Sequence, residues 1–363
     1  MRIALVHDFL MQRGGAERVL AALASRFPDA PIYTLLYDAQ MTDVYLPGRD
    51  IRASFLQKLP RWIRTRYRFL FPLMPYAASR LPVGEFDLII SSSSAFAKGV
   101  RRGTHAVHVC YCHAPSRFLW DDRRQYQKDN RFHFFTRLMI TVLIYPLQIW
   151  DVKTAERVDI WIANSKTTQE RIRRLYHKPS AVVYPPILQL KRHMPRIKKD
   201  GGYFLVVSRL SAYKRIDAIV DAFSMLTDRL VVVGTGREEE RLRARAGKNI
   251  SFAGFVSDED LAEYYAGCTA FIVACDDDFG MSAVEALSFG KPVIAYKKGG
   301  VTEWMEEGET GEFFDTQTPE AVRDAVHTFI KRKKEFDPAY MKKRAEEFSE
   351  KRFYENIMRL IPR

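Results

Sequence analysis

Two carboxylates, Asp277 and Glu285, stand eight positions apart in the second half of the chain. The residues around them predict a loop, a short helix that Ser282 caps and Gly290 ends, and a buried strand that begins at Pro292. The first backbone amides of such a helix have no partner within it, so they attract a diphosphate. A carboxylate one turn further in can accept hydroxyl hydrogen bonds, and the spacing therefore suits a nucleotide sugar.

Positive side chains follow the strand predicted at 203–208. Arg209 could hold a diphosphate with a bidentate guanidinium, and Lys214 could add an ammonium charge. Together they would stabilise the negative charge that grows on a departing diphosphate. The alternative is a solvated basic loop, which the position after the first strand of the second half disfavours; Arg215 is expected to be a bystander.

Paired glycines, Gly14 and Gly15, follow the first predicted strand and open the helix predicted at 16–25. They let backbone amides approach a ligand, and the helix start adds positive potential. An ordinary turn explains the pair equally well when it is considered alone. Gly234 ends a Val-rich strand, but Glu239 breaks the six-residue dinucleotide pattern, so a tight turn lining the nucleotide pocket is expected there.

His113 comes just past the strand predicted at 106–111, in a loop that Pro115 restricts. A lone histidine is often structural, but a position at the end of a strand favours a functional role. A zinc site is the competing interpretation, because further histidines and cysteines lie close by in the sequence. Residues two apart on a strand are roughly 6.6 Å apart, too far for neighbouring thiolates on one ion, so we expect no metal site. The residues in question are His105, His108, Cys110, Cys112 and His113.

Strands alternate with helical stretches in two rounds, which predicts two parallel, doubly wound α/β domains. We expect a first domain at 1–190, a linker at 191–201, a second domain at 202–345 and a last helical segment at 346–363. Ligands bind beyond the carboxyl ends of the strands in such sheets, so two facing domains would bind donor and acceptor in the cleft between them. The strands are predicted at 3–6, 32–36, 88–91, 106–111, 160–164, 203–208, 230–234, 250–253, 270–273, 292–296 and 311–314.

The length of 363 residues and a hydrophobic content of 47% suit two domains, each with its own core. The first residues run directly into a predicted strand, so we expect no signal peptide and a cytoplasmic chain. The four cysteines lie in apolar contexts and predict reduced thiols.

Charge is uneven along the chain. Residues 1–196 contain 31 Lys and Arg against 15 Asp and Glu, whereas residues 197–363 contain 26 against 29. All of the net charge of +13 therefore belongs to the first half, which predicts an anionic partner for it, either a nucleic acid or a membrane surface.

Residues 58–80 interleave six basic residues with aromatic ones and contain no acid. On a short helix this pattern suits an anionic membrane surface, and a region whose aromatics belong to the core is an equally good interpretation. The apolar run 138–150 is shorter than the roughly 20 residues that span a bilayer, so we expect a buried helix.

The segment from Asp277 to Glu285 resembles the donor-site signature of retaining glycosyltransferases of family 4, which have the GT-B fold of two Rossmann-like domains. The resemblance extends from the Gly14 loop to the last helix, with Asp277 in place of the first glutamate of the family pattern. It implies that Glu285 accepts ribose hydroxyls and that Arg209 and Lys214 bind the diphosphate. It also implies that the last helix crosses back onto the first domain.

The resemblance assigns further roles. His113 would approach the donor sugar near the reacting carbon, and the main chain of Gly254, Phe255 and Val256 would contact the base. Asp277 and the amides of Phe279, Gly280 and Met281 would hold the sugar. The leaving phosphate would take the acceptor proton, with no covalent nucleophile, no cofactor beyond the nucleotide sugar and no metal.

Together these features predict a hexosyltransferase, peripheral on the inner face of the cell membrane, that acts on a lipid-linked saccharide. The segment 112–120 and the Asp-rich loop are similar to polysaccharide mannosyltransferases, which favours GDP-mannose as the donor. Two rival functions are a nucleotide-sugar 2-epimerase of the same fold and a non-enzymatic nucleic-acid-binding protein. No nucleic-acid-binding module is recognisable, which disfavours the second rival.

Overall fold

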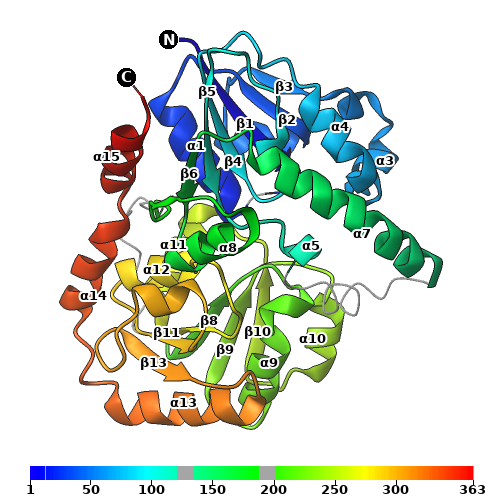
Figure 1. Cartoon of the computed structure of the whole chain (residues 1–363). Helices are drawn as coiled ribbons and strands as arrows, with labels where there is room; N and C mark the ends of the chain where they lie inside the picture. The colour runs from blue at the N-terminus through cyan, green and yellow to red at the C-terminus, as the bar shows by residue number, and fades with distance from the viewer. Residues whose placement is uncertain (13, 121–133, 188–200, 363) are drawn as a thin grey trace. The chain divides into compact units, whose positions relative to one another are not determined.

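The computed structural model describes residues 1–12, 14–120, 134–187 and 201–362 and contains two units. The first unit comprises 1–186 with 350–363, and the second comprises 187–349. Residues 191–200 of the predicted linker lie outside the described residues. The two parallel-sheet α/β units confirm the predicted fold class (Figure 1).

The sheet of the first unit has seven parallel strands in the order β3-β2-β1-β4-β5-β6-β7. Edge strands β3 and β7 were not predicted, because three and two residues are too few to give a periodic pattern. The strands are β1 (Ile3–Leu10), β2 (Ile32–Tyr37), β3 (Ile51–Ala53), β4 (Leu88–Ser93), β5 (Val107–Cys112), β6 (Ile160–Ala163) and β7 (Ala181–Val182).

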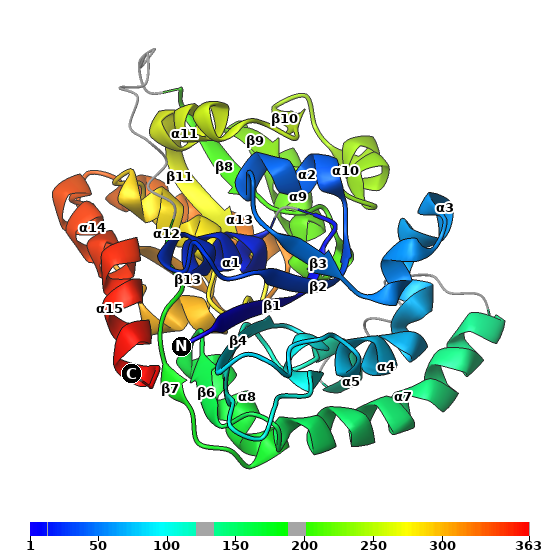
Figure 2. The ribbon, with the colours of Figure 1, turned by 90° about the horizontal axis from the view of Figure 1, so that it is seen from above.

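Helices cover both faces of this sheet (Figures 1 and 2). On one face, α1 (Gly15–Arg26) and α15 (Glu350–Leu360) share a core with alternate residues of β1, β4 and β5. Phe353 and Ile357 of α15 are buried in that core, and the Tyr354 hydroxyl donates to the Ala22 carbonyl at 2.8 Å. The last helix is therefore part of the first unit.

The opposite face packs against α4 (Met74–Ser79) and α7 (Phe134–Ala155). Shorter elements complete the unit: α2 (Ala39–Tyr45), η1 (Phe55–Lys58), α3 (Arg61–Arg64), η2 (Tyr67–Leu73), η3 (Ala97–Gly99), α5 (Arg117–Trp120) and α8 (Lys166–Tyr176).

The helix expected at 138–150 is present as part of α7, but it is buried on one side only. Along α7, Ile144 and Leu147 are buried, whereas Val142, Tyr145 and Ile149 are exposed. One side of the helix therefore covers the core, and the other side exposes apolar side chains. In the part of the chain that the structure describes, no helix combines the length and apolar content needed to cross a bilayer.

The basic and aromatic segment 58–80 forms three short helices, α3, η2 and α4, instead of one. Tyr67 and Phe71 pack against the core beside Phe9, so part of the aromatic pattern is structural. Trp62 and Phe69 are 65% and 69% exposed. The core interpretation therefore holds for some of the rings, and others remain exposed on the surface of the unit.

The second unit has six parallel strands in the order β10-β9-β8-β11-β12-β13. They are β8 (Tyr203–Val207), β9 (Arg229–Val233), β10 (Ile250–Gly254), β11 (Cys268–Val273), β12 (Val293–Tyr296) and β13 (Gly311–Phe314). The helical elements are η4 (Ala212–Lys214), α9 (Ile216–Ser224), α10 (Glu239–Arg245), α11 (Asp258–Gly267), α12 (Met281–Ser288), η5 (Gly300–Glu303), α13 (Pro319–Arg332), α14 (Pro338–Ala345) and η6 (Glu346–Phe348).

Helix α12 begins differently from the prediction. Gly280 is its N-cap in a left-handed conformation (φ 86°), and no side chain caps the helix, so the predicted cap at Ser282 is wrong. The glycine turns the chain directly into the first turn, which places Ser282 inside the helix. At the other end, Gly290 has a φ of 71° and the Lys291 amide returns to the Ala286 carbonyl, as predicted for a glycine stop.

Candidate active site

Both sheets have a point where the strand order reverses, and ligands of doubly wound sheets bind beyond the carboxyl ends of the strands at such points. In the first unit this point lies between β1 and β4, and in the second between β8 and β11. The candidate residues divide between these two places. Those of each unit are described separately.

His113 directly follows β5 in the first unit, and its side chain is partly exposed. Its Nε2 lies 2.7 Å from the Ser92 hydroxyl. Burial of the ring, and then the neighbouring His7, lower the pKa of His113 to about 3. The imidazole is therefore neutral at physiological pH, and it can donate or accept a hydrogen bond without adding charge to a site.

Three residues beside His113 were missed by the sequence analysis. Ser92 of β4 is fully buried, and its hydroxyl also lies 3.1 Å from His7 Nδ1. His7 Nε2 in turn lies 3.9 Å from a carboxylate oxygen of Glu17 on α1. They come from separate segments of the sequence, and the parallel register, which pairs His7 with Ser92, brings two of them together.

The Gly14–Gly15 pair lies at the start of α1, close to the same group. Gly14 is the N-cap and no side chain caps the helix. A Cβ on Gly14 would lie 2.9 Å from a carboxylate oxygen of Glu17, so a larger residue there would push that side chain aside. The glycine thus leaves room for Glu17.

Asp8, on β1, fixes the loop that follows β4. Its carboxylate accepts the backbone amides of Ser94, Ala95, Phe96 and Ala97 at 2.5–2.9 Å. One buried carboxylate thereby satisfies four backbone donors that would otherwise lie unpaired at the end of the sheet. The loop is held rigidly beside the strand order reversal.

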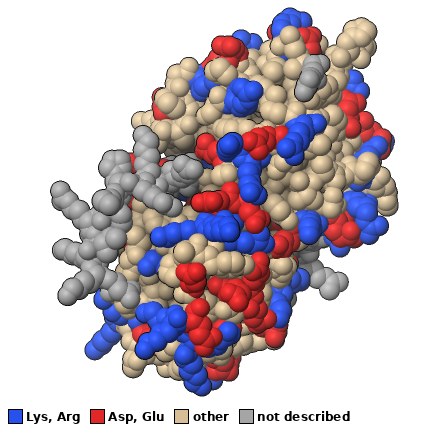
Figure 3. All heavy atoms as spheres, turned by 90° about the vertical axis from the view of Figure 1, so that its left-hand side faces the viewer, with Lys and Arg blue, Asp and Glu red and all other residues tan. Residues whose placement is uncertain are grey.

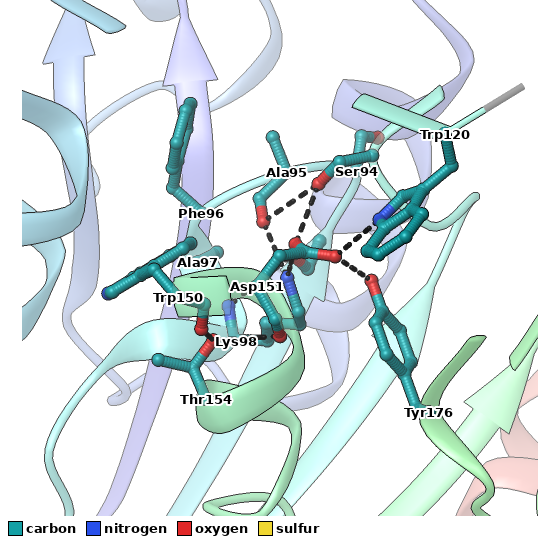
Figure 4. A network of polar contacts seen from close by, with 12 residues as sticks. Ser94, Ala95, Phe96, Ala97, Lys98, Trp120, Trp150, Asp151, Thr154 and Tyr176 are labelled. Atoms are coloured by element: carbon teal, nitrogen blue, oxygen red, sulfur yellow. Dashed lines mark hydrogen bonds and ion pairs between the residues drawn. The ribbon is translucent and has the colours of Figure 1, made fainter. Parts of the chain in front are cut away.

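A second buried carboxylate, Asp151 on α7, collects side chains from three other segments (Figure 4). It forms an ion pair with Lys98 and accepts hydrogen bonds from the Ser116 hydroxyl, the Trp120 indole and the Tyr176 hydroxyl at 2.7–2.9 Å. Asp151 and Lys98 are 0% and 2% exposed. This network ties the segment that follows His113 to the core of the first unit.

In the second unit, Lys214 and Asp277 lie together. Lys214 Nζ is 2.5 Å from Asp277 Oδ1, and their side chains are 17% and 16% exposed. Burial alone would lower the pKa of Lys214, but the attraction of Asp277 outweighs it and raises the pKa. Lys214 is therefore a fixed positive charge, bound to the carboxylate that was predicted to hold the sugar. Arg209 is exposed on the same loop, and its guanidinium lies 3.1 Å from the Tyr213 hydroxyl.

The loop from Asp277 to Met281 is braced by the segment that follows β12. The Gly300 amide donates to the Asp277 carbonyl at 2.8 Å, and the Trp304 indole donates to the Phe279 carbonyl at 3.0 Å. Phe279 and Gly280 are buried, whereas Met281 and Ser282 are partly exposed. The start of α12 is thus held in place, with its first residues reaching the surface of the unit.

Glu285 lies one turn inside α12, as expected, and is 1% exposed. The Tyr265 hydroxyl donates to Glu285 Oε2 at 2.9 Å. A tyrosine on α11 therefore orients this carboxylate, which was not predicted because the two residues lie on different helices. The same bond offsets part of the cost of burying the acid.

The other predicted donor residues follow β9 and β10. A Cβ on Gly234 would lie 2.0 Å from the Ser208 carbonyl oxygen, so the glycine permits a close backbone crossing over the loop that follows β8. The Gly234 amide donates to the Gly254 carbonyl at 2.7 Å. Phe255 is 70% exposed, and Val256 is partly buried beside it.

Comparison with protein-family models identifies the family of this chain. Residues 13–187 match the family model described as Glycosyltransferase Family 4, and residues 189–348 match the one described as Glycosyl transferases group 1. The chain belongs to glycosyltransferase family 4. This confirms the resemblance inferred from the sequence.

Curated relatives cover different shares of this glycosyltransferase. Mannosylfructose-phosphate synthase of Agrobacterium fabrum is 24% identical over 80% of the chain and 69% of its own length. D-rhamnosyltransferase WbpZ of Pseudomonas aeruginosa is 27% identical over 51% and 52%. A GDP-mannose-dependent phosphatidylinositol dimannoside mannosyltransferase of Mycobacterium tuberculosis is 33% identical over 39% of each chain. The match to the last two spans about half of their length or less.

Solved structures agree on the fold. Anabaena HepE in complex with UDP and glucose aligns over 99% of both chains with a TM-score of 0.72 and 18% identity. Sucrose-phosphate synthase of Thermosynechococcus elongatus aligns over 99% of this chain and 98% of its own with a TM-score of 0.68 and 16% identity. These likenesses show the GT-B fold of the glycosyltransferase.

His108 and Cys110, near His113, are buried in the glycosyltransferase. His108 Nε2 lies 2.8 Å from the Ser91 hydroxyl, and burial lowers the pKa of His108 to about 4. Cys110 is a buried free thiol, and burial raises its pKa to about 12. Within the described ranges, no group of three histidine, cysteine or acidic side chains is arranged to hold a metal ion.

Proposed function

We propose that this glycosyltransferase transfers mannose from GDP-mannose, with retention of configuration, to a lipid-linked saccharide. The observation that carries the proposal is the braced loop at α12, with Lys214, Asp277 and Glu285 at the strand order reversal of the second sheet. Mannose is favoured because a 33% identical relative is GDP-mannose-dependent and one matching 80% of this chain is a mannosylfructose-phosphate synthase.

The charged candidate residues of the second unit each have a role in this proposal. Arg209 and Lys214 bind the diphosphate and stabilise its charge as the sugar departs. Asp277, which holds Lys214, accepts sugar hydroxyls together with the first amides of α12. Glu285, oriented by Tyr265, accepts the ribose hydroxyls. The positive charges of Arg209 and Lys214 take the place of a divalent ion, so we expect no metal requirement.

Retention requires that the acceptor attack from the face that the diphosphate leaves. No protein nucleophile is needed in the proposed reaction, because the departing phosphate oxygen takes the acceptor proton. His113 contributes by positioning the sugar with a neutral ring. The rate enhancement then rests on orientation and charge stabilisation.

We propose an anionic membrane surface on the inner face of the cell membrane as the place where the acceptor is met. The segment 58–80 supports this, since Trp62, Phe69 and Tyr76 are exposed beside the exposed Arg61 and Arg66. Rings at headgroup depth and basic side chains near phosphates each favour binding, by on the order of 1 kcal/mol per charge. On the face shown in Figure 3, acidic and basic side chains are mixed.

A donor panel tests the function. Purified full-length protein is incubated with GDP-mannose, GDP-glucose, UDP-glucose or UDP-galactose, and thermal stabilisation and slow donor hydrolysis are measured. The proposal predicts that GDP-mannose stabilises most and is hydrolysed fastest. A response to UDP-sugars alone would replace the mannose assignment, and no response to any donor would contradict the transferase assignment of the site.

Membrane binding is tested separately by sedimentation with vesicles of phosphatidylcholine containing anionic phosphatidylglycerol. Binding should weaken when Trp62 and Phe69 are both changed to Ser, and Arg61 and Arg66 to Gln. Exchanging the exposed pair Arg173 and Arg174 on α8 for Gln provides a charge-matched control. Equal loss in both variants would show that net charge, and not this segment, determines binding.

A further inference from the structure

We infer that Glu17, His7 and Ser92 form a chain of positioning residues that fixes the proton of His113 on Nε2 and leaves Nδ1 as a hydrogen-bond acceptor. The chain runs across three adjacent strands, from α1 over β1 and β4 to the end of β5. This inference rests on the proposed function only for what His113 does with a substrate.

The geometry gives the chain its links. His7 Nε2 is 3.9 Å from Glu17 Oε1, His7 Nδ1 is 3.1 Å from Ser92 Oγ, and Ser92 Oγ is 2.7 Å from His113 Nε2. His7, Glu17 and Ser92 are 2%, 4% and 0% exposed. The last two contacts are within hydrogen-bond distance, whereas the first is an electrostatic contact between two buried groups. Because water is excluded from these groups, the cost of an unmatched donor or acceptor among them is high.

Hydrogen-bond polarity then sets the direction of the chain. We infer that the Glu17 carboxylate, 3.9 Å from His7 Nε2, attracts the ring proton of His7 to that nitrogen. His7 Nδ1 is then an acceptor and takes the single hydrogen of the Ser92 hydroxyl. Ser92 can only accept from His113, whose proton must therefore be on Nε2.

This direction determines what Nδ1 of His113 can bind. Nδ1 of His113 has no hydrogen-bond partner among the residues that the structure describes, and the side chain is partly exposed. A neutral ring with Nδ1 as acceptor suits a hydroxyl, which can donate to it. It does not suit a carboxylate, which can only accept, so the chain favours a neutral hexose over a uronic acid at this position.

Nitrogen NMR of the full-length protein labelled with ¹⁵N at histidine tests the inference without any substrate. His113 is assigned by comparison with His113→Asn. We expect a protonated Nε2 and an unprotonated Nδ1 in the unchanged protein. A proton on Nδ1 would show that the chain runs in the opposite direction and would overturn the inference.

Two substitutions test the chain itself. Glu17→Gln keeps the size of the side chain but can donate as well as accept, so His113 should populate both tautomers. In a Ser92→Ala background the same substitution should leave the His113 nitrogen shifts unchanged, because the link is broken. The role of Glu17 would be contradicted if Glu17→Gln did not change the His113 nitrogen shifts when Ser92 is present, or if it changed them equally with and without Ser92→Ala.

The effect on catalysis is measured as kcat and KM with the donor that is turned over fastest. Glu17→Gln should lower kcat roughly fivefold, because part of the His113 population then has the other tautomer, with little change in KM. Ser92→Thr, which keeps the hydroxyl, should retain more activity than Ser92→Ala. If no donor is turned over, the proposed function fails, while the NMR result still decides the direction of the chain.

Discussion

The two candidate sites of this glycosyltransferase are built in opposite ways. In the first unit, the polar side chains mostly interact with one another. His7, Glu17 and Ser92 are buried, and the carboxylates of Asp8 and Asp151 accept hydrogen bonds from protein groups. In the second unit, Lys214 and Asp277 are partly exposed and Arg209 is exposed. The polar groups of the first site are mostly buried and paired within the protein, whereas the second site exposes charged side chains.

The difference matches what each site is proposed to bind. A sugar is neutral and is recognised by fixed donors and acceptors, so a rigid hydrogen-bonded group serves it well. A diphosphate is anionic and calls for positive side chains that can still be reached. The comparison predicts that substitutions in the first site mainly change stability and orientation, and those in the second mainly change ligand affinity.

The largest expected effect tests the internal network of the first unit. Asp151→Ala would leave the buried Lys98 without its carboxylate, with only the Ala95 carbonyl among the described residues as a hydrogen-bond acceptor, and should destabilise the first unit by about 3–5 kcal/mol. Urea unfolding followed by tryptophan fluorescence measures this, since Trp120 and Trp150 lie beside the network. Glu170→Ala, which breaks an exposed pair with Arg173, should cost far less, because that pair is screened by solvent. Similar values for both variants would refute the contrast.

The next effect concerns the charged site. Lys214→Ala should weaken GDP-mannose binding by about 1.5–3 kcal/mol, which is roughly 10- to 150-fold, while thermal stability changes little. Calorimetric titration gives the affinity, and Lys297→Ala, which removes a lysine paired with Glu307 at the surface, is the control. A large loss of stability with unchanged affinity would make Lys214 a structural residue.

Buried neutral imidazoles give the first unit a particular pH dependence. Burial lowers the pKa of His108 from 6.5 to about 4, so as the pH falls the unfolded chain binds a proton at this residue before the folded chain does. The stability that neutral His108 contributes is therefore complete above pH 6.5 and is lost as the pH falls toward 4. The loss should approach about 1.4 kcal/mol per pH unit. Unfolding at pH 7.5 and 5.5 should show a smaller difference for His108→Gln than for the unchanged chain; equal differences would contradict the shift.

The smallest expected effect concerns the one buried acid of the second site. Tyr265→Phe removes the hydroxyl that donates to Glu285 and should cost about 0.5–1.5 kcal/mol of stability. If Glu285 binds ribose, donor affinity should also fall, because the carboxylate loses its orientation. Tyr264→Phe on the same helix supplies a control, since its ring is partly exposed.

Much of the fold could be predicted from the sequence, because apolar strands alternate regularly with helical stretches. The α12 loop was also recognisable, since its residues are contiguous. The group around His113 was not, because His7, Ser92 and Glu17 come from separate elements and meet only through strand register. The cap of α12 was wrongly assigned because the sequence pattern cannot show that Gly280 adopts a left-handed conformation.

The central claim is that the start of α12 and Glu285 hold a nucleotide sugar. Calorimetric titration of GDP-mannose into the unchanged protein and into Glu285→Gln tests it most directly, because the substitution keeps the size of the side chain and an acceptor for Tyr265. We predict measurable binding to the first and at least a tenfold weaker affinity for the second, with both proteins folded. Equal affinity in the two proteins would show that the donor binds elsewhere.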